Sequence, residues 1–70
     1  MGQDPKDVTR DITWDLSALV KELNALRADA NYWLEGPEYA SLRLRLESAH
    51  AGAEAALVEA RRRVRLNEGS

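Results

Sequence analysis

The chain has 70 residues, no cysteine and a net charge of −2, and 31% of its residues are charged. A chain of this length has little room for an enclosed core, and without cysteine it has no disulfide and no thiolate metal site to compensate. The near-neutral charge gives no general attraction to nucleic acid or to an anionic membrane, while the 44% share of hydrophobic residues is typical of a folded chain.

The first predicted element is a helix over about residues 5–34. Asp4 is a suitable N-cap, and Pro5 suits the first helical position. From there apolar residues recur at alternating spacings of four and three, which is the pattern of a coiled-coil seam. The seam consists of Ile12, Leu16, Leu19, Leu23, Leu26, Ala30 and Trp33.

A turn is predicted at residues 35–37, followed by a second helix over about residues 38–66. We expect Gly36 to adopt the left-handed conformation that ends many helices, and Pro37 to open the next helix. The second helix continues the same apolar spacing, so it has a seam of its own. This seam consists of Tyr39, Leu42, Leu46, Ala49, Ala53, Ala56 and Ala60.

Two helices of similar length joined by a short turn predict an all-α, antiparallel two-helix hairpin with coiled-coil-like packing. Each helix of about 30 residues is roughly 45 Å long. Aspartates begin the first helix and arginines end the second, so the hairpin brings opposite charges to one end. We expect residues 1–70 to form a single helical-hairpin domain.

Apolar residues beyond the two seams predict that the hairpin needs a further partner. Four of them flank the same side of both seams, where we expect one open groove, and two more lie further round their helices. They are Val20, Leu34, Leu57 and Val64, with Trp14 and Leu44 further round. Exposed apolar surface of this extent marks an interface, so we expect the hairpin to complete a helical bundle by oligomerisation or partner binding.

Small residues on the second helix mark a further part of the predicted interface. They are Ala49, Gly52, Ala53 and Ala56. Small side chains let helix axes approach closely or leave room for a bulky side chain of a partner. A mid-helix glycine costs about 1 kcal/mol relative to alanine, which favours a contact role for Gly52.

Two polar patterns suggest alternative chemistry. Glu47 and His50 lie three residues apart on one helix face, as in di-iron bundles, but such a site needs further carboxylates from facing helices. The chain has a single histidine, so we expect a solvated pair, no metal and no cofactor. The arginines at 61–65 could contact phosphate, but they suit the negative end of the helix dipole and lie near aspartates that repel nucleic acid.

The turn and the second helix resemble a known family. Gly36-Pro37-Glu38-Tyr39, followed by Leu42, Ala49, Ala53 and Leu57, resembles the small helical-hairpin co-chaperones of type III secretion needle subunits. Members of that family are cytoplasmic hairpins that join a tetratricopeptide-like chaperone and hold the needle subunit unpolymerised. The resemblance implies a similar role and does not extend to the first helix.

The sequence therefore predicts a non-enzymatic protein–protein interaction module in the cytoplasm. No nucleophile–histidine–acid set and no glycine-rich phosphate loop is present. The expected partner is a helical protein or a second copy of the chain, giving a homo- or hetero-oligomer, with no nucleic acid and no membrane. Three hypotheses remain open: a secretion co-chaperone, a self-associating four-helix-bundle structural or regulatory protein, and a metal-binding bundle around Glu47 and His50.

Overall fold

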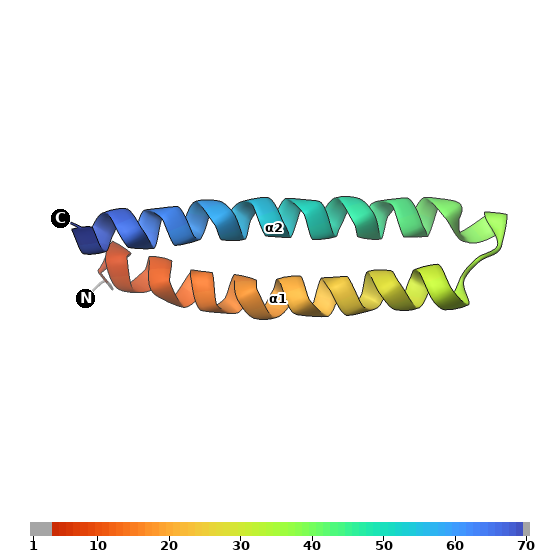
Figure 1. Ribbon diagram of the computed structural model, residues 1–70, viewed down its shortest axis with the longest axis horizontal. Helices are drawn as coiled ribbons and strands as arrows, with labels where there is room; N and C mark the ends of the chain where they lie inside the picture. The colour runs from red at the N-terminus through yellow and green to blue at the C-terminus, as the bar shows by residue number, and fades with distance from the viewer. Residues whose placement is uncertain (1–3, 70) are drawn as a thin grey trace.

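The computed structural model describes residues 4–69, which form two long helices and one short helix (Figure 1). Helix α1 is Pro5–Trp33, the 3-10 helix η1 is Pro37–Tyr39 and helix α2 is Ala40–Gly69. Helices α1 and α2 lie side by side and antiparallel, with the turn at one end and both ends of the chain at the other (Figure 1). The all-α hairpin predicted from the sequence is confirmed.

Local sequence determines where α1 begins. The Asp4 carboxylate accepts a hydrogen bond from the backbone N–H of Lys6 at 2.9 Å, and Pro5 occupies the first turn. This bond satisfies one of the N–H groups that have no partner at a helix start. The hydroxyls of Thr9 and Thr13 donate to backbone carbonyls four residues earlier in α1, each at 2.7 Å.

The turn differs from the prediction at Gly36. This residue is extended, with φ −63° and ψ 153°, so the expected left-handed conformation is wrong. The reason is Pro37, because the ring of a proline pushes the preceding residue towards extended conformations. The Arg43 guanidinium instead caps the end of α1 by donating to the carbonyls of Leu34 and Gly36, the latter at 3.1 Å. The N–H of Tyr39 donates to the Gly36 carbonyl at 3.0 Å and closes η1.

Helix α2 begins later than predicted because Pro37–Tyr39 form η1, and it continues through Gly69. The arginines at 61–65 therefore lie inside the helix, and its last turn carries no basic residue.

The helices contact each other through a narrow stripe of side chains, called here the contact stripe. Its buried members are Ala30, Leu57 and Ala60. Half-buried members are Leu16, Val20, Leu23 and Leu34 of the first half of the chain and Leu46, Ala53 and Val64 of α2. A pair of helices can cover only one stripe on each partner, so the core stays thin.

The contact stripe is rotated about the helix axes relative to the predicted seams. Leu57 was expected to border an open groove, but it is only 7% exposed, and Val20, Leu34 and Val64 are half-buried along the same stripe. Leu57 therefore does not border an open groove, whereas Val20, Leu34 and Val64 keep part of their surface exposed, and the role of all four in an interface stays a prediction. The rotation turns their flank inward and brings Arg27 of α1 to Glu47 of α2.

The hairpin is long and only one helix layer thick. It measures 50 × 24 × 15 Å and has a radius of gyration of 15.8 Å. A compact domain of this length has a radius of gyration of about 11 Å. Both broad faces of the hairpin therefore reach solvent.

Candidate protein-interaction surface

The predicted seam residues that the rotation leaves outside form a surface called here the open apolar face. Its large members are Ile12, Leu19, Leu26 and Trp33 of α1, with Tyr39 and Leu42 beyond the turn. Their exposed fractions run from 39% for Tyr39 to 74% for Trp33. The four α1 members are seven residues apart, so they follow one side of the helix. Single exposed apolar residues are ordinary, but a row along a whole helix is typical of an interface.

Both helices contribute to this face near the turn. An open groove there is lined by Leu26, Asp29, Ala30, Trp33 and Leu34 on one side and by Leu46 of α2 on the other. Only one of these side chains is charged. Further along α2 the face continues with Ala49 and Ala56, both exposed. The α1 side of the face is therefore built of large side chains, and the α2 side of small ones.

Two aromatic residues close the turn end of α1. The rings of Tyr32 and Trp33 meet edge to face, with centroids 4.7 Å apart and an interplanar angle of 77°. Both side chains remain exposed despite this contact. Exposed tryptophan and tyrosine beside an apolar groove are enriched among the residues that anchor protein interfaces.

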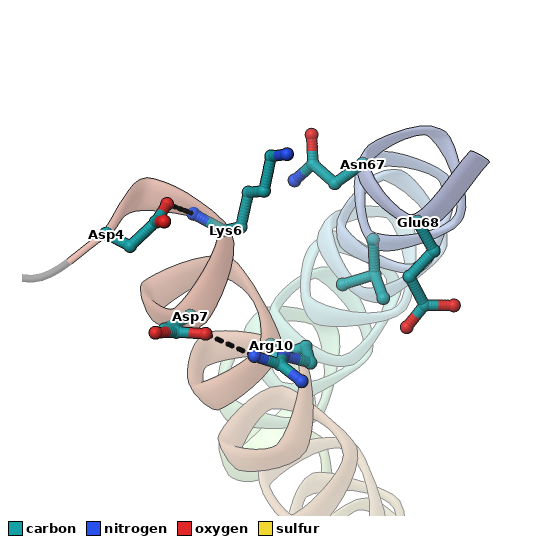
Figure 2. A pocket seen from close by; sticks show the side chains of 7 residues that line it. Asp4, Lys6, Asp7, Arg10, Asn67 and Glu68 are labelled. Atoms are coloured by element: carbon teal, nitrogen blue, oxygen red, sulfur yellow. Dashed lines mark hydrogen bonds and ion pairs between the residues drawn. The ribbon is translucent and has the colours of Figure 1, made fainter. Parts of the chain in front are cut away.

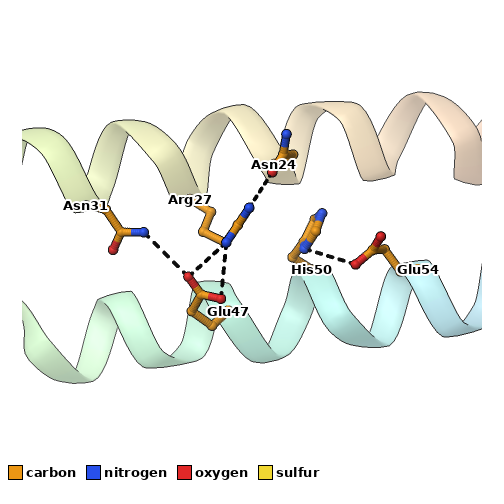
Figure 3. A network of polar contacts seen from close by, with 6 residues as sticks. All are labelled: Asn24, Arg27, Asn31, Glu47, His50 and Glu54. Atoms are coloured by element: carbon orange, nitrogen blue, oxygen red, sulfur yellow. Dashed lines mark hydrogen bonds and ion pairs between the residues drawn. The ribbon is translucent and has the colours of Figure 1, made fainter.

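The opposite side of the hairpin carries a polar network (Figure 3). The Arg27 guanidinium lies 3.2 Å from the Glu47 carboxylate across the two helices. Arg27 also donates to the side-chain carbonyl of Asn24 at 2.6 Å, and the Asn31 amide donates to Glu47 at 3.4 Å. The two long sides of the hairpin thus differ in chemistry, one apolar and one charged.

The metal candidates belong to this polar side. The Glu47 carboxylate is already held by Arg27 and Asn31, and His50 Nδ1 lies 3.4 Å from Glu54 Oε1 (Figure 3). Within residues 4–69, no three metal-ligating side chains gather in a group that could hold an ion. A metal ion at Glu47 would have to displace the Arg27 guanidinium. The pattern of residues in the sequence does not indicate this ion pair between Arg27 and Glu47.

The structure places the other predicted interface residues at different depths. Ala53 is half-buried in the contact stripe, whereas Ala49, Gly52 and Ala56 are exposed. A Cβ added at Gly52 would meet no atom within 4 Å, so this glycine makes no close contact inside the chain. Trp14 and Leu44 are both strongly exposed and lie outside the contact stripe.

The two chain ends meet at a polar pocket (Figure 2). It is lined by Asp4, Lys6, Asp7 and Arg10 of the α1 end and by Val64, Asn67 and Glu68 of α2. The ion pairs near this end are local: Arg10 pairs with Asp7 within α1, and Arg63 lies 3.5 Å from Glu59 within α2. Across the described part of the chain, the α1 aspartates form no ion pair with the α2 arginines.

Comparison of the chain with protein-family models, with characterised proteins and with solved structures found no match. Neither long helix, as far as residues 4–69 show, combines the length and apolarity needed to cross a membrane. The surface chemistry of the hairpin is therefore the basis for assigning a function.

Proposed function

We propose that the chain is a non-enzymatic protein–protein interaction module whose open apolar face binds a helical partner. The observation that carries this proposal is the row of large exposed side chains at seven-residue intervals along α1, from Ile12 to Trp33. A helix laid along such a row buries one of its own apolar stripes, which is a common mode of helix recognition. The polar network on the other side of the hairpin favours this face over that side for an apolar partner.

The exposed area supports the same proposal. The chain exposes 5594 Å², whereas a compact monomer of its mass exposes about 4,400 Å². The difference of about 1,200 Å² exceeds the roughly 800 Å² that each partner buries in a standard interface. Part of this difference reflects the elongated shape of the hairpin.

The thin core gives a second reason for a partner. Ala30, Leu57 and Ala60 are the only buried apolar residues of the described chain, and two of them are alanines. Below about 70–80 residues a single core rarely supplies more than 3–5 kcal/mol even when it is well filled. Each square ångström of apolar surface removed from water adds roughly 25 cal/mol, so a bound helix would contribute substantially to stability.

The proposal includes two more specific roles, and each rests on a single feature of the chain. A secretion co-chaperone in the cytoplasm is supported by the resemblance of the turn and α2 to that family. A self-associating hairpin is supported by the open apolar face, which has large side chains on α1 and small ones on α2.

A matched pair of leucine substitutions tests the interaction face. Leu26 lies on the open apolar face, whereas Leu44 is equally apolar and exposed but lies outside it. The purified chain should either assemble, as measured by sedimentation, or bind an apolar fluorescent dye as a monomer. Leu26→Glu should abolish whichever of these is observed, and Leu44→Glu should leave it unchanged. A monomer that binds no dye, or equal effects of the two substitutions, would contradict the proposal.

A further inference from the structure

We infer that the occupant of the open apolar face is a second copy of this chain, packed face to face about a two-fold axis parallel to the helices. In this arrangement α1 of each copy lies antiparallel on α2 of the other, giving a four-helix bundle with both turns at one end. The inference rests on the proposed function, because it names the partner of the same face. A two-fold dimer uses one patch on both copies, so that patch must be complementary to itself.

The contacts within the hairpin fix which residues of α1 and α2 lie at the same height. Arg27 and Asn31 both contact Glu47. Counting away from this contact in opposite directions along the two helices places Trp33 level with Leu42. It also places Leu26 level with Ala49 and, two turns further, Leu19 level with Ala56.

The size pattern is complementary between copies at the two heights that pair leucine with alanine, whereas Trp33 meets Leu42 near the turn. A two-fold axis parallel to the helices leaves heights unchanged, so α1 of one copy meets α2 of the other at the levels found within the hairpin. Leu26 and Leu19 then pack on Ala49 and Ala56 of the second copy. Large side chains meet small ones, which lets facing layers interdigitate without voids.

The charges beside the open apolar face also bear on how two copies would pack. The rim of α1 next to this face carries Asp15, Glu22 and Asp29, again at seven-residue intervals. The corresponding rim of α2 carries Arg45 at the height of Asp29 and Glu59 at the height of Asp15, and Glu59 pairs with Arg63 one turn further along α2. The height of Glu22 corresponds to Gly52, which presents no side chain. The level of Asp29 and Arg45 therefore brings opposite charges together between copies, which favours this orientation over others.

The other face-to-face arrangement conflicts with both patterns. A two-fold axis perpendicular to the helices would place α1 on α1 and α2 on α2. Leucines would then face leucines, and Ala49 and Ala56 would face alanines. The acidic rims of the two α1 helices would also lie together, which is unfavourable for like charges. A partner other than a second copy would need small side chains opposite Leu19 and Leu26 and a basic residue opposite Asp29, and Ala56, Ala49 and Arg45 of the chain itself supply them.

Disulfide cross-linking tests the arrangement, because the natural sequence has no cysteine and an introduced one is the only thiol. Asp29→Cys and Arg45→Cys are made as separate variants, mixed, refolded together and oxidised. We expect a covalent dimer in the mixture and none in either variant alone, since only the mixture brings these two positions together. The control mixture is Lys21→Cys with Glu54→Cys, two positions that line the polar side, and it should give no covalent dimer.

Three outcomes would overturn the inference. A dimer by sedimentation without the Asp29–Arg45 cross-link, or a Glu22→Cys variant that links to itself, would show a different arrangement. A monomer at micromolar concentration would show that the occupant is not a second copy. If that monomer binds apolar dye and Leu26→Glu abolishes the binding, the proposed function still holds; if it binds none, both proposals fail.

Discussion

Arg27 of α1 and Glu47 of α2 meet across the hairpin, with Nη1 of the guanidinium 3.2 Å from Oε1 of the carboxylate. Arg27 belongs to the side of α1 that faces α2, and its Nε is buried without a hydrogen-bond partner. Turning this guanidinium away from Glu47 would leave a half-buried charge with less compensation. The pair therefore holds one long side of the hairpin polar and leaves the large apolar side chains on the other.

Removing the carboxylate of this pair should destabilise the hairpin measurably. We expect Glu47→Ala to lower the free energy of unfolding by about 0.5–1 kcal/mol, because Arg27 remains half-buried and loses its main acceptor. Glu59→Ala is the matched control, since Glu59 pairs with Arg63 at 3.5 Å in a more exposed position. It should change the free energy by less than about 0.5 kcal/mol. Urea unfolding followed by circular dichroism at one fixed chain concentration measures both, and equal losses would contradict the role of the Arg27 pair.

Shortening Leu57 should weaken the hairpin itself. Leu57 is the largest buried side chain of the contact stripe, so Leu57→Ala leaves a gap between the helices. We expect a loss of about 2–3 kcal/mol in unfolding free energy, near the lower end for buried leucines because the thin core can partly relax. The neighbouring Val58 is exposed, and Val58→Ala should stay within about 0.5 kcal/mol of the parent chain. A Leu57→Ala chain as stable as the Val58→Ala chain would show that Leu57 is not packed against α1.

The antiparallel helices were predictable from the sequence, but the rotation of the contact stripe was not. Spacings of three and four define an apolar stripe, and this stripe is wider than one partner helix can cover. Val20 and Leu57 on one edge and Leu19 and Leu26 on the other were equally compatible with the inner position. In the structure Val20 and Leu57 take the inner position, where Arg27 also reaches Glu47, and an apolar pattern does not contain that information.

The conformation of the turn was also not predictable from the local sequence pattern. Gly36 was expected to end α1 in the left-handed conformation, because glycine is the residue that most often does so. The restriction imposed by Pro37 on the residue before it acts in the opposite direction and determines the conformation found. The capping by Arg43 depends on a long-range contact between α2 and the end of α1, which local sequence does not reveal.

Exchanging a large and a small side chain between the two sides of the open apolar face tests whether a second copy fills it. Ala56 is exposed in the single hairpin, so Ala56→Leu should leave its helix content unchanged. In the dimer the added side chain would meet Leu19 of the second copy, and overpacking of this kind costs about 1–3 kcal/mol, which should weaken dimerisation roughly 5- to 150-fold.

The matched variants make this result specific to the proposed contact. Leu19→Ala alone should also weaken dimerisation, because it removes buried apolar surface. The double variant Leu19→Ala/Ala56→Leu restores the total volume of the layer with the sizes exchanged, so it should dimerise more tightly than either single variant. Sedimentation equilibrium gives the dissociation constants of all four chains. Additive losses in the double variant would show that positions 19 and 56 do not meet between copies, whatever the oligomeric state of the parent chain.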